Sequence, residues 1–218
     1  MKQWDKIFRK EGKHYSSHLD YIDEIKKIFK RHNVKRILDL GCGAGNHLIH
    51  LAKSGFEMHG IDISKEAIKI TKQGLKENNL NAKLKVGHIY EKLPYEDNFF
   101  DAIISIRVIH HANIKQIRNL IGEIERILKH NGLIFITVRK RISKKKMTKS
   151  KWIDNRTYIP LEGKEKGVTH YLFNKNILRK EFRNFKIHTI WIEPRNEEEK
   201  KKRKSWESYY CLLAEKQS

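Results

Sequence analysis

The stretch Ile37-Leu38-Asp39-Leu40-Gly41-Cys42-Gly43-Ala44-Gly45-Asn46 decides the fold of this chain. An apolar strand runs into an acidic residue and then into a loop with glycine at every second position, and a helix is expected directly after it. Glycine lets the backbone turn tightly and approach a ligand, because no Cβ stands in the way. The free N–H groups at the start of the helix suit the polar end of that ligand. The pattern is typical of the binding turn of a doubly wound α/β sheet.

The spacing in sequence between the glycine turn and a following acidic residue carries further information. Asp62 lies nineteen positions after Gly43 and ends a second strand-like segment. Neighbouring parallel strands bring its carboxylate beside the turn, where it can accept both hydroxyls of a ribose. Asp62 could instead serve only as a cap for the helix near Ser64, but that role leaves the glycines unexplained. The dinucleotide template G-x-G-x-x-G fails, because Asn46 holds its last position.

The composition sets outer limits on the kind of protein. The 218 residues are enough for one α/β domain with a full core, and 39% of them are hydrophobic. We expect no membrane span and no signal peptide, and two isolated cysteines, Cys42 and Cys211, indicate a reducing cytoplasm. The net charge of +21 raises nucleic acid as a partner, but a generally lysine-rich composition explains it slightly better.

The periodicity predicts strands that alternate with helices, and therefore a Rossmann-like, mostly parallel sheet with helices on both faces. An amphipathic helix precedes the first strand, with isoleucines and Phe29 at helical spacing. The predicted strands cover 36–40, 57–62, 84–87, 100–106, 133–138, 185–192 and 208–214. Four helices are predicted after the glycine turn. The first ends near 54, and the others cover 64–78, 114–129 and 174–182. Asn131-Gly132 ends the third of them.

We expect a single domain in four parts. Residues 1–34 form an N-terminal helical cover, and 35–138 form the ligand-binding core. Residues 139–168 are rich in lysine and lack a clear period, which predicts an insertion or flexible lid without a core of its own. Residues 169–218 hold a helix and two closing strands, which a charged turn joins as an antiparallel hairpin.

Three further motifs appear in order along the core. They are Leu93-Pro94 before Phe100-Asp101, then Val108-Ile109-His110-His111, and then Glu125-Arg126-Ile127-Leu128-Lys129 before Asn131-Gly132. With the D-x-G-x-G-x-G turn, they resemble the landmarks of the class I S-adenosylmethionine-dependent methyltransferases between about Arg36 and Val138. The resemblance implies a seven-stranded sheet with its last strand antiparallel, and S-adenosylmethionine as the cofactor.

The resemblance also implies roles for single residues. Asp39, Gly41, Gly43 and Gly45 would hold the amino-acid end of the cofactor, and Asp62 would bind its ribose with Ile63 against the adenine. Arg107 would lie near the methionine moiety or the substrate. His88, followed by Ile89, stands where the family commonly has an acidic residue that accepts from the adenine amino group. A neutral histidine can still accept through one ring nitrogen, or the backbone makes the contact.

The residues leave the catalytic group open. Methyl transfer needs an acceptor aligned with the sulfonium methyl, and a base only where the acceptor holds its proton. Candidates for that base are His110, His111, Tyr15 and His170, with Tyr171 beside the last. For both His110 and His111 the sequence favours a structural role, as a loop hydrogen bond or a helix start. His14 and His18 have zinc-ligand spacing, but nothing nearby completes a set, so no metal site is expected.

The sequence therefore predicts a methyltransferase whose substrate is a small molecule. A tRNA or other RNA base remains an alternative, in which the lysine runs would neutralise phosphates. The segment from Thr169 to Phe173 is similar to segments of both small-molecule and tRNA wobble-uridine methyltransferases, and its aromatic residues could also simply pack on the sheet. A third alternative is a cofactor-binding or RNA-binding protein of the same fold without catalysis. Nothing in the sequence indicates an oligomeric state.

Overall fold

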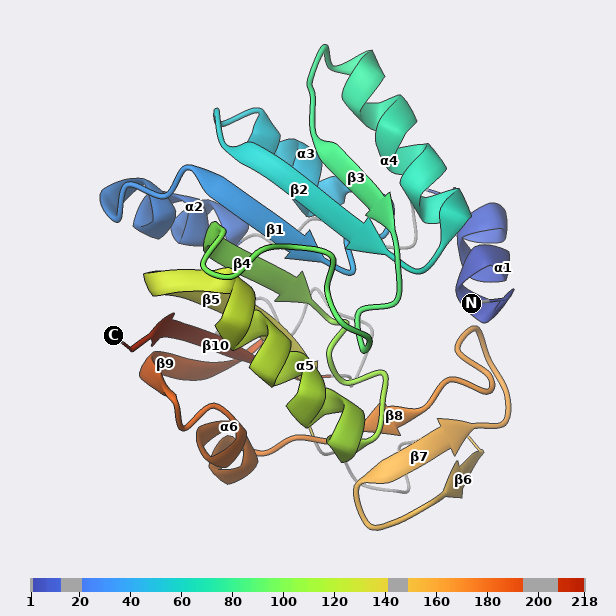
Figure 1. Ribbon diagram of the computed structural model, residues 1–218. Coiled ribbons are helices and arrows are strands. Elements are labelled where there is room, and N and C mark those ends of the chain that lie inside the picture. The colour runs from blue at the N-terminus through green and yellow to red at the C-terminus, as the bar shows by residue number, and fades with distance from the viewer. Residues whose placement is uncertain (1, 13–20, 141–148, 194–207, 218) are drawn as a thin grey trace.

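The main sheet has seven strands in the order β3-β2-β1-β4-β5-β10-β9 (Figure 1). This computed structural model describes residues 2–12, 21–140, 149–193 and 208–217. Among the described strands of this sheet only β10 runs opposite to the others, as the resemblance implies for the last strand. The strands are β1 (Arg36–Leu40), β2 (Glu57–Asp62), β3 (Lys83–Val86), β4 (Phe100–Ile106), β5 (Leu128–Arg139), β9 (Phe185–Glu193) and β10 (Tyr209–Lys216).

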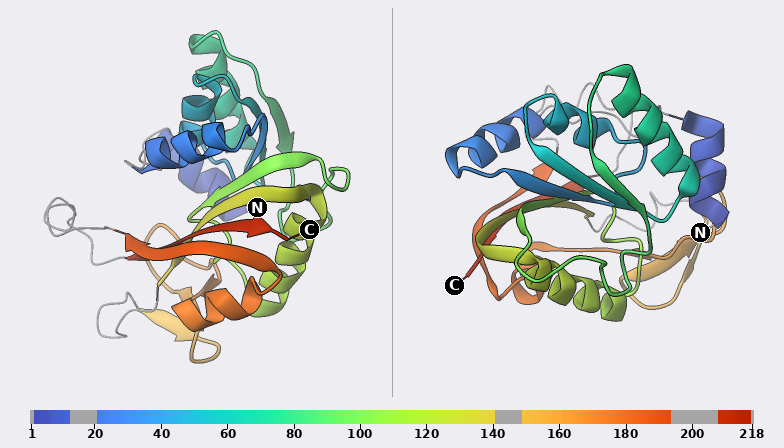
Figure 2. Two further views of the ribbon diagram at one scale, coloured as in Figure 1. Left: turned by 90° about the vertical axis from the view of Figure 1, so that its left-hand side faces the viewer. Right: turned by 45° about the horizontal axis from the view of Figure 1, so that its top comes forward.

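Helices cover both faces of this sheet, as Figures 1 and 2 show. They are α1 (Lys2–Glu11), α2 (Ile22–Arg31), α3 (Asn46–Ala52), α4 (Lys65–Glu77), α5 (Ile114–Ile127) and α6 (Lys175–Glu181). Strand β5 explains why two layers are needed, because successive side chains of a strand point to opposite faces. Ile134 and Ile136 pack with α5 and α6, whereas Leu133 and Phe135 pack with α2, α3 and α4. Burial on both faces is the rule for parallel strands.

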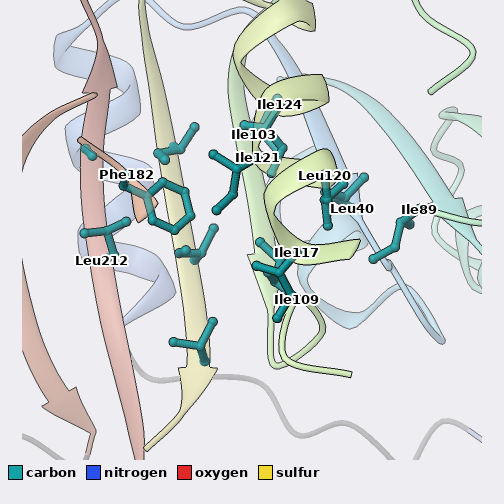
Figure 3. Packing of buried hydrophobic residues seen from close by; sticks show 14 of the residues in the cluster. Leu40, Ile89, Ile103, Ile109, Ile117, Leu120, Ile121, Ile124, Phe182 and Leu212 are labelled. Carbon is teal, nitrogen blue, oxygen red and sulfur yellow. The ribbon is translucent and has the colours of Figure 1, made fainter. Parts of the chain in front are cut away.

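The larger of the two apolar layers lies between α5 and the sheet. Figure 3 shows Ile117, Leu120, Ile121 and Ile124 of α5 directed at the strands, with Phe182 beside them. These are the positions that the helical period predicts for the apolar stripe of this helix. The layer holds β4 rigidly, and the carboxyl end of β4 is one wall of the site described below.

Helix α5 ends earlier than the sequence predicts. The predicted end at Asn131-Gly132 is wrong, because the last helical residue is Ile127 and Leu128 already begins β5. Backbone N–H groups of Asn98 and Phe99 take the last carbonyls of the helix, at 2.9 and 2.8 Å. Leu128 pairs with Phe100 at the start of β4, and the register then shifts before Ala102 pairs with Leu133. Asn131 has a φ of 59° and lies in this irregularity of the strand.

A second, small sheet begins in the segment 139–168, for which the sequence predicts no regular structure, and ends just after it. Its three strands, β6 (Ser150–Trp152), β7 (Thr157–Pro160) and β8 (His170–Tyr171), pair antiparallel in that order. Strands of two to four residues are too short to give an alternating pattern, which is why periodicity does not reveal them. Figure 1 shows this sheet beside α1, at the carboxyl ends of the central strands.

The topology fixes where a ligand can bind. The chain runs outward from β1 to β3 on one side and from β4 onward on the other, so the strand order reverses between β1 and β4. In open α/β sheets ligands bind outside the carboxyl ends of the strands at this reversal. No helix in the described ranges is both apolar enough and long enough to cross a lipid bilayer.

Removal of the capping box of α5 tests this account of the helix. Asn113 Oδ1 accepts from Gln116 N at 3.0 Å, and the Gln116 side chain accepts from Asn113 N at 3.3 Å. We expect Asn113→Ala to lower the free energy of unfolding by about 1 kcal/mol, because it leaves helix N–H groups without that partner. Urea denaturation measures the change. The matched control is Asn119→Ala on the exposed side of the same helix, for which we expect a change within about 0.5 kcal/mol. Equal effects of the two substitutions would contradict the assignment.

Candidate active site

The glycine turn between β1 and α3 has the left-handed backbone that its sequence requires. The φ angles of Gly41, Gly43 and Gly45 are 81°, 53° and 80°. A Cβ at Gly41 would lie 2.5 Å from the Val108 side chain, and one at Gly45 would lie 2.6 Å from Thr71. Larger residues are therefore excluded by both strain and space.

Asp62 holds this turn against the end of β2. Its Oδ2 accepts from the Gly43 backbone N–H and its Oδ1 from that of Ser64, both at 2.8 Å. Ser64 in turn caps α4, accepting from Ala67 N at 3.1 Å. Asp62 is only 7% exposed, and burial raises the pKa of its carboxyl although both amides favour the ionised form. Its carboxylate thus lies beside the turn, where the spacing from Gly43 predicts it.

Asp39 is a second buried carboxyl close to Asp62. It is 2% exposed, and burial followed by the charge of Asp62 raises its pKa to about 8. Its Oδ2 has no hydrogen-bond partner in the described part of the chain. Buried polar atoms are normally paired, so this oxygen is available to a cationic or hydrogen-bonding group of a ligand. This unpaired carboxyl oxygen fits the amino-acid end of S-adenosylmethionine, which carries an ammonium group.

A cavity of about 750 Å³ opens where these groups meet. All the residues with a predicted cofactor role line it except Gly45, which lies behind the turn against Thr71. The segment that follows β4, the end of β5 and the small sheet with its β7–β8 loop contribute further residues to the wall. The size is within the range of small-molecule and cofactor sites.

Helix α1 covers the cofactor half of this cavity. Asp5 Oδ1 accepts from Ser64 Oγ at 2.7 Å, and Phe8 lies against the glycine turn so closely that a Cβ at Gly43 would be 3.1 Å from its ring. On the other side, Gln3 donates to the Lys164 carbonyl at 2.8 Å, which joins α1 to the loop between β7 and β8. The sequence gives no sign of these contacts, because the partners lie far apart in the chain.

His88 lies at the cavity wall after β3, where the sequence predicts it. Its Nδ1 accepts from the Tyr90 backbone N–H at 3.3 Å. In a neutral imidazole the proton must then be on Nε2, which makes that nitrogen a donor. The sequence allows this ring to accept a hydrogen bond from an adenine amino group. In this tautomer Nε2 can only donate, so that hydrogen bond does not fit. A ring nitrogen of the adenine would be a suitable acceptor for it instead.

Arg107 is held in place by a residue that the sequence analysis missed. It has a φ of 60° and its guanidinium donates to Glu193 Oε1 at 2.8 Å, while Tyr21 donates to Glu193 Oε2 at 2.9 Å. Its guanidinium also lies 4.6 Å from the centre of the Tyr209 ring. Glu193, at the end of β9, is 1% exposed. The only sequence signal for Glu193 was its place as an acid at the end of a mostly apolar strand.

Three of the four candidate catalytic residues lie together, and two of them, His110 and His111, line the opposite side of the cavity. The ring centres of His110 and His111 are 4.2 Å apart, and that of His170 lies 4.9 Å from His111. Burial first, and then the neighbouring His111, lowers the pKa of both His110 and His170 well below the usual range, so both rings are neutral. Tyr15, the fourth candidate, lies outside the described residues, as do His14 and His18.

Glu165 and Arg139 complete the charged groups of this histidine cluster. Glu165 Oε2 lies 3.2 Å from His170 Nε2 and 3.7 Å from Arg139 Nη2. Arg139 donates to the Tyr158 hydroxyl at 2.9 Å, and the Tyr158 ring stacks on His170 at 5.0 Å. Both charged residues come from the stretch where no period is visible, so the sequence could not place them here.

Comparisons with known proteins agree with this architecture. A family model described as "Methyltransferase domain" matches residues 37–132. The ubiquinone biosynthesis O-methyltransferase of Pelagibacter ubique is 34% identical over 104 residues, which are 48% of this chain and 41% of that protein. The chain thus matches less than half of that relative's length.

Two solved structures share the fold. A S-adenosylmethionine-dependent methyltransferase from Clostridium acetobutylicum has a TM-score of 0.72 at 12% identity, over 100% of this chain and 99% of that one. The 1,6-didemethyltoxoflavin-N1-methyltransferase of Burkholderia thailandensis, solved with 1,6-didemethyltoxoflavin and S-adenosylhomocysteine, has a TM-score of 0.68 at 15% identity, over 91% and 79%. The strand order and these similarities show that the chain has the fold of these solved methyltransferases, and that its residues 37–132 are similar to the family described as a methyltransferase domain.

Proposed function

We propose that this protein transfers the methyl group of S-adenosylmethionine to a small-molecule acceptor. The observation that carries the proposal is one cavity with two chemically different halves. The buried carboxyls Asp39 and Asp62 and the glycine turn form one half, and His110 and His111 line the other. The named relatives act on small molecules at oxygen or nitrogen, which supports the same substrate class here.

In the cofactor half, each group has a task that its surroundings support. Asp39 would pair with the ammonium group, and Asp62 would accept from the ribose hydroxyls with the lone pairs that Gly43 and Ser64 leave free. Ile63 and Ile89 line the same cavity and offer apolar contact to the adenine. The bound cofactor supplies an activated methyl group on a sulfonium.

The acceptor half has to align a nucleophile and keep water away. Alignment alone can provide much of the rate, because it makes the reaction effectively unimolecular. The neutral ring of His110, which lines the cavity, can accept a hydrogen bond from an acceptor hydroxyl or amine and so orient its lone pair. Trp4 packs on His111 with ring centres 4.9 Å apart, which covers the cluster from the side of α1.

The enclosure of the cavity favours a small molecule over RNA. Helix α1 and the loop between β7 and β8 are joined across it by the contacts of Gln3 and Lys164, so a macromolecule would have to displace them. The lysine runs at 144–146 and 200–204 lie outside the described residues. A cytoplasmic location also belongs to the proposal, and the two buried free thiols, Cys42 and Cys211, support a reducing compartment.

Radiolabelled methyl transfer tests the proposed function. The purified protein and labelled S-adenosylmethionine are incubated with a panel of small phenols, catechols and amines, and in parallel with total tRNA and with protein extract. We expect label only in the small-molecule fraction. Label in tRNA would contradict the proposal and favour an RNA methyltransferase. No label in any fraction, while S-adenosylhomocysteine still binds, would favour a non-catalytic protein.

The ribose assignment is tested by a change at Asp62. We expect Asp62→Ala to weaken the binding of S-adenosylhomocysteine at least tenfold in calorimetry. The substitution removes the acceptor for the ribose hydroxyls and also the acceptor of the Gly43 amide. The matched control is Asp101→Ala, since Asp101 likewise accepts two backbone N–H groups, from Lys35 and Arg36, but at the amino ends of the strands. Affinity should be unchanged in the control. Equal affinities for all three proteins would refute the ribose role.

The raised pKa of Asp39 predicts that cofactor binding releases a proton. With a pKa of about 8 the carboxyl is mostly protonated at pH 7, and an ammonium group beside it favours the ionised form and lowers its pKa. About 0.9 proton per ligand should therefore be released at pH 7. Calorimetry of S-adenosylhomocysteine in two buffers with different ionisation enthalpies measures this release. Asp39→Asn should bind more weakly and lose the buffer dependence, and a wild-type binding heat independent of buffer would contradict the assignment.

A further inference from the structure

We propose that His110, His111 and His170 bind a zinc-type divalent metal ion, with Glu165 as a fourth ligand. The sequence predicts no metal site, because these ligands come from three separate stretches of the chain. His110 and His111 follow β4, Glu165 lies in the loop before β8, and His170 begins β8. The Tyr171 backbone N–H donates to the His110 carbonyl at 2.7 Å and holds the two histidine-bearing segments together.

The geometry of the cluster suits a tetrahedral ion. One ring nitrogen from each histidine lies within 4.8 Å of the others. Glu165 Oε2 is 3.2 Å from His170 Nε2, and its Oε1 is 3.9 Å from His111 Nε2. Zinc–nitrogen bonds of about 2.0–2.1 Å place such ligand atoms about 3.3 Å apart. Binding of an ion would have to draw the three ring nitrogens from the 4.8 Å limit to that spacing.

Unsatisfied buried nitrogens point to a ligand at this place. His110 and His170 are 1% and 0% exposed. The Nδ1 atoms of both have no hydrogen-bond partner within the described ranges, and the contact of His170 Nε2 with Glu165 lies at ion-pair distance without hydrogen-bond geometry. Buried polar atoms are normally satisfied, and a metal ion would satisfy ring nitrogens that the protein does not. The stack of Tyr158 on His170 fixes that ring in its plane.

The charges around the cluster select the kind of metal. Arg139, 3.7 Å from Glu165, opposes a cation that binds through charge alone, such as magnesium or calcium. Imidazole ligands instead suit zinc, cobalt and nickel, which bind neutral nitrogens strongly. The metal would face the cavity that the proposed function assigns to the acceptor, but its binding does not depend on that function.

Cobalt titration of the metal-free protein tests the site. Protein without any histidine tag is treated with a chelator, dialysed and titrated with Co²⁺. We expect one equivalent to bind with the visible absorption of low-coordinate cobalt, and one equivalent of Zn²⁺ to abolish that absorption. His170→Ala and, independently, His111→Ala should each weaken binding at least tenfold. His130→Ala removes an exposed histidine elsewhere and should change nothing.

Two further readings separate the possible failures. Circular dichroism shows whether each variant is folded, and S-adenosylhomocysteine binding on the same samples reports on the cofactor half. Absence of the absorption in folded wild-type protein, or its persistence in both cluster variants, would overturn the metal site. Loss of S-adenosylhomocysteine binding in protein that still binds cobalt would instead count against the proposed function and leave the metal site standing.

Discussion

The structure depends on one buried carboxylate, that of Asp62, and on the two backbone amides that it binds. The bonds to Gly43 and Ser64 join the end of β2 to the turn after β1 and to the start of α4. Asp39 lies near enough for the charge of Asp62 to raise its pKa to about 8. Two buried acids at one end of a sheet are costly in the free protein, because neither is fully solvated when ionised. A cationic ligand removes that cost, so the same feature opposes stability and favours binding.

The strand order separates the groups suited to the cofactor from the histidine cluster. The carboxyl ends of β1, β2 and β3 carry the groups suited to the cofactor, whereas the segment after β4 and the small sheet carry the histidine cluster. Helix α1 contacts both halves, through Asp5 on one side and Gln3 on the other. The cavity is therefore bounded by elements from almost the whole length of the chain, although the family match covers residues 37–132. Outside that match, the small sheet and the loop between β7 and β8 contribute to the acceptor half.

The sequence predicts features that depend on neighbouring residues or on a fixed spacing between two residues. The bounds of β1, β2 and β4 agree with the predicted ranges, because buried parallel strands are continuous apolar runs with clear ends. The placement of Asp62 beside Gly43 follows from a fixed spacing. The histidine cluster, Glu193 and the short strands β6 to β8 depend on contacts between distant segments, which no local pattern encodes. Helix α5 ends early for the same reason, since Asn98 and Phe99 come from another segment to take its last carbonyls.

The central claim is that the carboxyl edge of β1 and β2 binds a sulfonium nucleoside with its sugar on Asp62. The most direct measurement is a crystal structure of the protein with S-adenosylhomocysteine. The account predicts both ribose hydroxyls at hydrogen-bond distance from the Asp62 carboxylate and the ammonium group beside Asp39. A nucleoside bound with its sugar directed away from Asp62, or a cavity that stays without ligand at saturating concentration, would contradict it.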